Sequence, residues 1–506
     1  MDSNGDGTGD LPGILSRLDY LQWLGVDAIW ISPIFPSPMA DFGYDVASYT
    51  DIEPIFGTLA DFDALVEAAH RHDMRVILDY VPNHSSDQHP WFVTSRSSRQ
   101  NDKRDWYLWR DGSPAGGPPN NWLSAFGGSG WEWDPSTAQF YYHAYLKEQP
   151  DLNWRNPDLK SAMYDVLRFW FERGVDGFRI DALRQVVKDA QFRDNPPDPD
   201  WSPGQDPYRS LLPLHSADQP ELMDIVHDFR AISDGYPDRV LIGELWLSID
   251  RLVAYYGREG RGLHLPFNFH LILTPWQAPA IAALIDTYEA ALPPNAWPNW
   301  VLGNHDRPRV ATRVGAAQAR VAAMLLLTLR GTPTVYNGDE IGMHDVPIPP
   351  ELVQDPFEKN VPGLGVGRDP ERTPLQWSAA AHAGFTQGSP WLPIADDFAE
   401  VNVERQRDDP RSMLTLHRRL IELRRRTPAL SVGGYTPVHA DDDLLVYERA
   451  VDDERVRVAL NLSHAGRAIP WSEPRARVLI STHLDRDGEV GDRLDLRADE
   501  GVVVRC

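Results

Sequence analysis

Short apolar runs alternate with stretches of helical periodicity along the first 430 residues of the chain. The stretch LPGILSRLDYLQWLG (11–25) places apolar residues at helical spacing, and VDAIWISPIF (26–35) is an almost unbroken apolar run, as in a buried strand. The same order returns as a helix over 59–73 and a strand over 74–84. This alternation predicts a parallel sheet covered by helices.

The alternation resumes after residue 156 and continues to about residue 430. It predicts strands at 175–182, 238–245, 263–269, 299–306 and 332–338, and helices at 157–173, 219–234, 249–256, 277–291, 311–329 and 411–427. Seven barrel strands are therefore expected, beginning near residues 26, 76, 175, 238, 263, 299 and 332.

A (β/α)8 TIM barrel has eight strands, and the one without a counterpart here is the first. We expect it to belong immediately before Met1, so that either the true start lies upstream or the barrel is open. An open barrel would leave two unpaired strand edges, which lower stability and favour aggregation. Restoring an upstream strand is expected to raise solubility and activity.

Two parts of the chain break the alternation. The stretch 85–156 is rich in Trp, Gly and Pro and too long for a simple connection, so it is predicted to form a small domain inserted after the third barrel strand. Short alternating strands after residue 430 predict a β-sandwich. The predicted domains are the barrel (1–84 and 157–430), the inserted domain (85–156) and the C-terminal sandwich (431–506).

Composition narrows the classes of protein that the chain could be. Among its 506 residues, 42% are apolar and 24% charged, as in ordinary soluble globular proteins. A net charge of −25 argues against nucleic acid or anionic membranes as partners. No window approaches the roughly 20 apolar residues of a membrane span. The single cysteine, Cys506, excludes an internal disulfide and indicates a cytoplasmic location.

Candidate reactive residues lie at the predicted carboxyl ends of barrel strands, where TIM-barrel enzymes place their chemistry. Four motifs end there: PNHSS (82–86), GFRIDA (177–182), GELW (243–246) and GNHD (303–306). A single carboxylate at such a position could merely cap a helix or pair with an arginine. Acids that end three different strands favour a shared site. The candidates are Asp181, Glu244 and Asp306, with His84, Arg179 and His305 beside them.

Two carboxylates across a barrel mouth suggest glycoside chemistry, in which a retaining enzyme needs them about 5–5.5 Å apart. Arg179 is two residues before Asp181, so both side chains share one strand face, and the guanidinium is expected to keep Asp181 ionised. Apolar neighbours would favour the protonated form of Glu244, as a general acid requires. No zinc-spaced His/Cys cluster, glycine-rich phosphate loop or serine nucleophile elbow competes with this interpretation.

Through these motifs the chain resembles glycoside hydrolase family 13, the α-amylase family, over nearly its whole length. The resemblance is to the α-glucosidase and oligosaccharide glucosidase branch, and also to trehalose synthase. It implies that Asp181 is the nucleophile with Arg179 as its partner, and that Glu244 is the acid/base. It further implies that Asp306 grips two hydroxyls of the bound sugar with the help of His305.

Further motifs extend the resemblance to the substrate pocket. DFGYD resembles the family's substrate loop, which implies that Tyr44 stacks under the terminal glucose and that Asp41 binds a far hydroxyl. GRDPERTPLQW resembles a late motif whose Arg368 would pair with Asp41 and close the pocket behind the non-reducing end. DYVPNH supplies His84, and Tyr145 stands where the family usually has Phe.

These residues predict a retaining α-glucosidase that acts on short oligosaccharides such as maltose, as a monomer or small homo-oligomer. In related α-glucosidases the residue after the nucleophile tends to be Val where α-1,6 linkages are preferred and Ala or Thr where α-1,4 linkages are preferred; here it is Ala182, which favours α-1,4. The alternatives are trehalose synthase, transglucosylation to other acceptors, and a non-catalytic binding relative. The last is disfavoured because every acid is present and no membrane anchor is visible.

The opening segment MDSNGDGTGD has oxygen-bearing side chains at alternate positions, as in loops that bind hard cations. The candidate ligands are Asp2, Asn4, Asp6, the carbonyl of Thr8 and Asp10. Gly13 stands where an EF-hand has its bidentate Glu, so this is not an EF-hand. The resemblance implies a structural Ca²⁺ or Mg²⁺ ion away from the acids, and no organic cofactor is expected.

Overall fold

The structure is a computed structural model that describes residues 1–473 and 475–506. Its centre is a parallel sheet in the order β1 (Ala28–Ile31), β2 (Arg75–Tyr80), β6 (Gly177–Ile180), β7 (Val240–Gly243) and β8 (Leu265–Pro266). β9 (Asn299–Val301) pairs in parallel with β10 (Thr332–Thr334), and a bridge between Asn268 and Trp300 joins the β8 segment to β9. The strands thus follow one another in chain order around a barrel wall.

All seven barrel strands expected from the sequence are present. Over the described part of the chain, no strand pairs with the outer edge of β1 or with the outer edge of β10. The strands are shorter than predicted, because the apolar runs continue past the paired residues into the loops. Ile34 and Phe35, for example, are buried beyond the end of β1.

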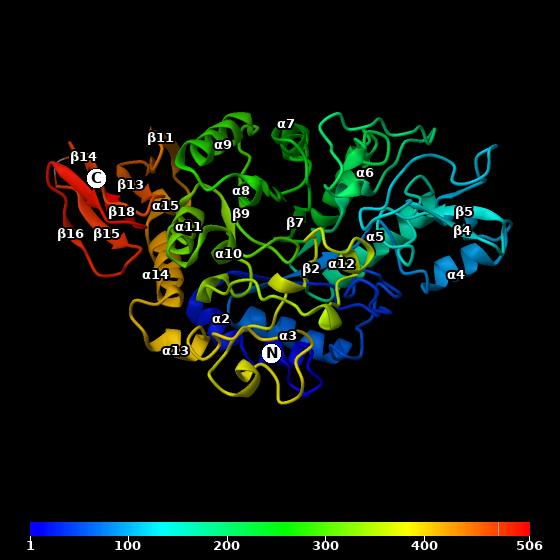
Figure 1. Cartoon of the computed structure of the whole chain (residues 1–506), viewed down its shortest axis with the longest axis horizontal. Coiled ribbons are helices and arrows are strands. Elements are labelled where there is room, and N and C mark those ends of the chain that lie inside the picture. The colour runs from blue at the N-terminus through cyan, green and yellow to red at the C-terminus, as the bar shows by residue number, and fades with distance from the viewer. Residues whose placement is uncertain (474) are drawn as a thin grey trace.

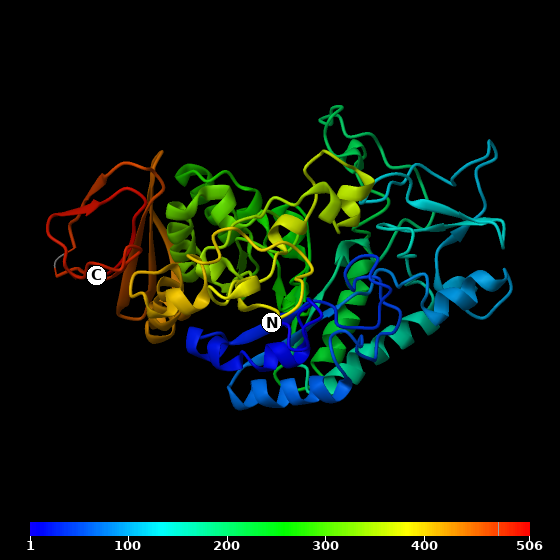
Figure 2. The same ribbon diagram turned by 60° about the horizontal axis from the view of Figure 1, so that its bottom comes forward.

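Helices lie along the outside of this sheet: α3 (Leu59–Arg71), at the bottom of the view in Figure 2, packs against α5 (Pro157–Glu172) through Phe62 and Trp170, whose ring centroids are 5.0 Å apart. Thr58 and Asp61 form a capping box at the start of α3, and the Asn156 side chain caps α5. The barrel helices are α1 (Leu11–Leu15), α2 (Leu18–Leu24), α3 (Leu59–Arg71), α5 (Pro157–Glu172), α6 (Leu222–Ser233), α7 (Ile249–Ala254), α8 (His270–Leu273), α9 (Ala278–Ala291), α10 (Val310–Val314), α11 (Ala316–Thr328) and α14 (Met413–Arg426).

Two helices predicted as single elements are each divided. The stretch 11–25 forms α1 and α2, because Ser16 donates its hydroxyl to the carbonyl of Gly13 and the backbone of Arg17 leaves the helical region. The stretch 311–329 forms α10 and α11 around Gly315, whose φ of 81° lies outside the helical region. The remaining helices are α4 (Pro90–Ser97), α12 (Pro356–Asn360), α13 (Val403–Asp408) and α15 (Pro428–Ser431).

Sheets of antiparallel strands lie at the two ends of the molecule, with the barrel between them (Figure 1). One is the three-stranded sheet β3-β5-β4, made of β3 (Trp109–Arg110), β4 (Trp131–Asp134) and β5 (Gln139–Tyr142). Its stretch of chain also contains Trp122, which packs with Trp131 and Tyr142 in a small aromatic core. This sheet lies within the stretch predicted to be an inserted domain.

The C-terminal part has two antiparallel sheets facing each other. The larger has the order β11-β12-β13-β18-β15-β16 and the smaller pairs β14 with β17. Val458 of β13 joins the main core, whereas its neighbour Ala459 packs toward Trp471 and Leu494, so alternate residues face opposite sides. The strands are β11 (Gly434–Ala440), β12 (Leu444–Val451), β13 (Glu454–Asn461), β14 (Arg467–Pro470), β15 (Arg477–Ser481), β16 (Gly488–Glu489), β17 (Arg493–Leu496) and β18 (Gly501–Arg505).

The architecture is the one expected from the sequence, a barrel of parallel strands followed by a C-terminal antiparallel domain. None of the helices formed by the described residues is both long enough and apolar enough to cross a membrane.

Candidate active site

Arg179 is the centre of the candidate site. Its side chain projects from β6, is only 1% exposed, and lies opposite Asp79 in the parallel register between β2 and β6. Nη1 donates to Asp79 at 2.9 Å and to Asp181 at 2.5 Å, and Nη2 lies 2.8 Å from Glu244. One guanidinium therefore holds the acids at the ends of three neighbouring strands.

The carboxylates of Asp181 and Glu244 are close neighbours, because the two terminal nitrogens of one planar group bind them. Ala182 adopts a left-handed conformation with φ 46°, and its N–H donates to Oε2 of Glu244 at 2.8 Å. The indole N–H of Trp246 donates to the other oxygen at 3.0 Å. Both oxygens of Glu244 are thus held by hydrogen bonds.

The ionisation of Asp181 differs from the expectation drawn from the sequence. Burial raises the pKa of Asp181 well above its usual range, and the negative charges of Glu244 and Asp79 raise it further. Arg179 lowers this pKa, but it does not offset the other effects because the same guanidinium also serves the two competing carboxylates. Burial likewise raises the pKa of Asp79 to about 6.

Asp306 has the opposite electrostatic setting. Burial opposes its ionisation, but His305, Arg372 and Arg368 together hold its pKa well below the ordinary range. Arg372 donates to Asp306 at 2.8 Å and Arg368 at 3.3 Å. The ring of His305 is parallel to that of Tyr44, with centroids 5.8 Å apart, and burial lowers the His305 pKa to about 3. A permanent carboxylate and a neutral imidazole therefore stand side by side.

The predicted pair between Asp41 and Arg368 is formed. Nη2 of Arg368 donates to Asp41 at 2.8 Å and to Asp355 at 2.7 Å, so this guanidinium joins three acids. Its carbon lies 4.8 Å from the ring centroid of Phe126, which belongs to the stretch predicted to be inserted. Residues 41, 306, 355 and 368, far apart in the chain, close one side of the site.

His84 and Tyr145 complete the set of residues predicted for the substrate. Nε2 of His84 lies 3.2 Å from the carbonyl of Tyr44, and its ring is 5.4 Å from that of Tyr145. Tyr44 donates its hydroxyl to Asp79 at 3.0 Å. The structure thus brings together all of the predicted catalytic and substrate-binding residues: Asp41, Tyr44, His84, Tyr145, Arg179, Asp181, Ala182, Glu244, His305, Asp306 and Arg368.

Four residues of the site had no predicted role. Asp79 begins the DYVPNH motif, which implied no role for it, and it faces Arg179 across the β2–β6 register. Arg372 follows Arg368 by four residues and donates to the carbonyl of His305 at 2.6 Å. Gln149 donates to Asp41 at 3.2 Å. Asp355 carries no motif signal and is recognisable only from its contacts with Arg368.

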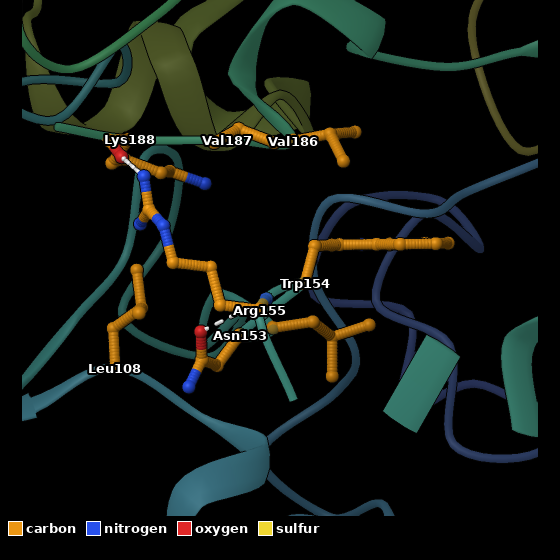
Figure 3. Close-up of a pocket in the computed structure, with 8 residues that line it drawn as sticks. Leu108, Asn153, Trp154, Arg155, Val186, Val187 and Lys188 are labelled. Atoms are coloured by element: carbon orange, nitrogen blue, oxygen red, sulfur yellow. Dashed lines mark hydrogen bonds between the residues drawn. The ribbon is translucent and has the colours of Figure 1, made fainter. Parts of the chain in front are cut away.

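A small cavity lies apart from the acids, between the segments 152–155 and 186–188 (Figure 3). Its volume of about 10 Å³ offers room for about one water molecule, not for a sugar ring. Arg155 crosses it and donates to the carbonyl of Lys188 at 2.6 Å. A larger groove of about 520 Å³ on the outer face of α5 and α6 is lined by Tyr164, Arg168, Asp228 and Tyr236, and contains none of the acids.

The opening loop is organised by its own hydrogen bonds. The Asp2 carboxylate accepts the N–H groups of Asn4, Gly5 and Gly7. Asp10 caps α1 and accepts two bonds from Ser3. No group of three or more His, Cys, Asp and Glu side chains in the described part of the chain could hold a metal ion. The oxygen donors suit a hard cation chemically, but in this structure the Asp10 carboxylate accepts the N–H of Gly13 at the start of α1.

The family model "Alpha amylase, catalytic domain" matches residues 1–433. The chain belongs to the α-amylase family. The match covers the seven barrel strands and the acids described above, and this family member is a glycoside hydrolase.

Relatives of known name support this assignment. A probable alpha-glucosidase from Rhizobium meliloti (strain 1021) is 42% identical over 92% of this chain and 87% of its own. An oligo-1,6-glucosidase from Parageobacillus thermoglucosidasius is 35% identical over 91% of this chain and 88% of its own. The solved structure of an alpha-glucosyl transfer enzyme, XgtA, superimposes with a TM-score of 0.94 at 39% identity, covering 100% of this chain and 96% of its own.

Proposed function

We propose that this α-amylase family member is a retaining α-glucosidase that releases terminal α-linked glucose from short oligosaccharides. The observation that carries the proposal is the Arg179 guanidinium shared by Asp181 and Glu244. It holds two carboxylates as close neighbours, which suits double displacement better than the 6.5–9.5 Å separation of inverting enzymes.

In the first step the ionised carboxylate of Asp181 attacks the anomeric carbon, and a glucosyl ester forms as the glycosidic C–O bond breaks. Glu244 gives its proton to the departing oxygen. In the second step Glu244 takes a proton from water, which attacks the same carbon and releases Asp181. Two inversions at one carbon retain the α configuration. The bonds from Ala182 and Trp246 hold Glu244 in position for both transfers.

The remaining groups bind and orient the glucosyl unit. Asp306, held ionised by arginines, is suited to accept hydrogen bonds from two sugar hydroxyls. Tyr44 offers an aromatic face for the ring, backed by His305. The Arg368–Asp41 pair closes the site behind the non-reducing end, which supports action on single terminal units.

Incubation with maltose tests the proposed reaction. Its stereochemistry is read from an aryl α-glucoside, in which the transferred glucosyl unit is the only sugar: time-resolved NMR is expected to show α-glucose as the first product, which then mutarotates. Initial β-glucose from the aryl glucoside would overturn the retaining mechanism, and trehalose accumulating from maltose would show that the trapped glucosyl unit is isomerised rather than hydrolysed.

Transfer to an acceptor other than water is the second candidate function. It is favoured by the 39% identity to an alpha-glucosyl transfer enzyme over the whole chain. The same covalent intermediate serves both reactions, because only the attacking hydroxyl differs. Adding increasing concentrations of an alcohol to a maltose reaction would separate them: a growing yield of alkyl glucoside indicates transfer, and free glucose alone indicates hydrolysis.

The linkage is proposed to be α-1,4, and Ala182 supplies a test. Ala182→Val is expected to lower kcat/KM on maltose by about tenfold, because a β-branched residue at φ 46° is strained and would displace the N–H that binds Glu244. The ratio of activity on isomaltose to that on maltose is expected to rise. Parallel kinetics on the two disaccharides measure both effects, and an unchanged ratio would contradict the role of Ala182 in linkage preference.

A pH profile tests whether the pKa of Asp181 is raised in the active site. The nucleophile must be ionised and its pKa is raised, so kcat/KM is expected to fall toward acid pH with a midpoint above the ordinary aspartate value of about 3.9. Asp306 stays ionised and adds no limb in this range. Rates on maltose from about pH 3 to 8 give the midpoint, and a limb at or below pH 4 would contradict the raised pKa.

We further propose that the opening loop takes Ca²⁺ or Mg²⁺ in a structural role, on the strength of its oxygen donors. Millimolar Ca²⁺ is expected to raise Tm, and a chelator to reverse the rise. Asp6→Asn should remove the response, whereas Asp19→Asn, at an exposed acid outside the loop, should keep it. An unchanged Tm in Ca²⁺ would instead favour a loop held by hydrogen bonds alone.

A further inference from the structure

Lys188 is a buried cation that no step of the proposed reaction uses. Its side chain is 1% exposed and forms an ion pair with Asp151, whose side chain is fully buried. Its Nζ also donates to Oδ1 of Asn83 at 2.7 Å. Burying such a pair is costly unless further hydrogen bonds satisfy it. The bond from Lys188 goes to Asn83, the residue before His84 of the substrate site.

The ammonium group fixes the orientation of the Asn83 amide. A lysine ammonium can only donate, so the atom facing it must be the amide oxygen. The amide nitrogen is then the atom that lies 3.0 Å from Nδ1 of His84, and it donates there. Nδ1 must therefore accept. Burial lowers the pKa of His84 to about 3, so the ring is neutral and its single proton resides on Nε2.

Nε2–H faces the substrate site. It lies 3.2 Å from the carbonyl of Tyr44 and 3.1 Å from Nε2 of Gln149. The Gln149 amide is also fixed, because its oxygen accepts the N–H of Leu146 and its nitrogen donates to Asp41. Two nitrogens that both carry hydrogen consequently lie 3.1 Å apart, and one hydroxyl oxygen that approaches both from the side would accept from both.

We infer that Lys188, acting through Asn83, is a positioning residue that fixes His84 as a hydrogen-bond donor to a hydroxyl oxygen of the bound glucosyl unit. This inference rests on the proposed function. Without Lys188 the Asn83 amide could turn its oxygen to Nδ1, and His84 would then carry its proton on Nδ1. Nε2 would become an acceptor for Gln149 and lose its bond to the carbonyl of Tyr44.

The tautomer can be measured directly in the native enzyme. Long-range ¹H–¹⁵N correlation spectra of ¹⁵N-histidine-labelled protein distinguish the two tautomers, and the His84→Gln variant identifies the His84 signals by their loss. The Nε2–H form is expected between about pH 6 and 8, well above the His84 pKa. An Nδ1–H form would overturn the inference. Because this readout needs no turnover, a wrong assignment of the reaction would leave it unaffected.

Variants test the role of Lys188. Lys188→Met combined with Asp151→Asn removes the pair without leaving a buried charge, and is expected to shift His84 to Nδ1–H. Lys188→Arg keeps a buried cation that can only donate beside Asn83 and Asp151, so it is the matched control and should keep Nε2–H. Retention of Nε2–H in the double variant would overturn the inference.

Kinetics on monodeoxy aryl α-glucosides supply the functional readout. In the wild type, removal of the hydroxyl that meets His84 is expected to lower kcat/KM by about tenfold, the cost of one neutral hydrogen bond. In the double variant this penalty should fall toward onefold, while the penalties for the other hydroxyls persist. A general loss of activity with the same pattern of deoxy penalties would indicate a purely structural role for Lys188.

Discussion

Replacement of Asp181 by Asn is expected to lower kcat on maltose by about 10⁴- to 10⁶-fold, the range seen when a covalent nucleophile is removed. The amide has the size of the carboxylate but cannot form the glucosyl ester. The fold should survive, because Arg179 keeps its bonds to Asp79 and Glu244. Steady-state kinetics with enough enzyme to measure the residual rate, together with Tm, check both parts of the prediction.

The same substitution should not destabilise the protein at neutral pH. The folded-state pKa of Asp181 lies above its ordinary value, so its contribution to stability is present at low pH and is lost as pH rises through the raised pKa. A neutral Asn avoids this loss, and its Tm should equal or exceed that of the wild type at pH 7. Asp165→Asn, at an exposed acid on α5, is the control: the same type of substitution outside the site should leave activity on maltose unchanged. Activity within tenfold of wild type would refute the role of nucleophile.

The sequence located most of the site because of one geometric property of the fold. Parallel strands bring their carboxyl ends to one mouth, so residues such as Asp181 and Glu244, 63 positions apart, could be placed together from strand ends alone. The pair between Asp41 and Arg368 could not be reached in this way, because both residues lie in loops. It was predicted only through the family resemblance, and the structure contains it.

Other features depend on distances that no motif encodes. The raised pKa of Asp181 is a balance between burial, one guanidinium and two neighbouring carboxylates, and the sign of such a sum cannot be read from spacing. Asp355 was missed because its segment lacks a periodic signal, although its carboxylate accepts from both the backbone N–H and the guanidinium of Arg368. The break at Gly315 was missed because an apolar helical period continues across it.

Replacement of Glu244 by Gln is expected to lower kcat/KM on maltose by about 10²- to 10⁴-fold, the usual contribution of a general acid. The loss should depend on the leaving group. A sugar hydroxyl needs a proton to depart, whereas a dinitrophenolate departs as an anion, so the first step on 2,4-dinitrophenyl α-glucoside should be far less affected. Pre-steady-state measurement of the phenolate released is expected to show a burst, because the second step, which needs Glu244 as base, becomes slow.

Comparison with Asp181→Asn makes this test specific. Loss of the nucleophile should abolish release from both substrates, whereas loss of the acid should spare the activated one. Azide needs no base to attack the glucosyl ester, so it should accelerate turnover of Glu244→Gln. The product should be α-glucosyl azide, because this attack is the second inversion at the anomeric carbon. Equal losses on both substrates, or no response to azide, would show that Glu244 orients Asp181 through Arg179 instead of transferring the proton.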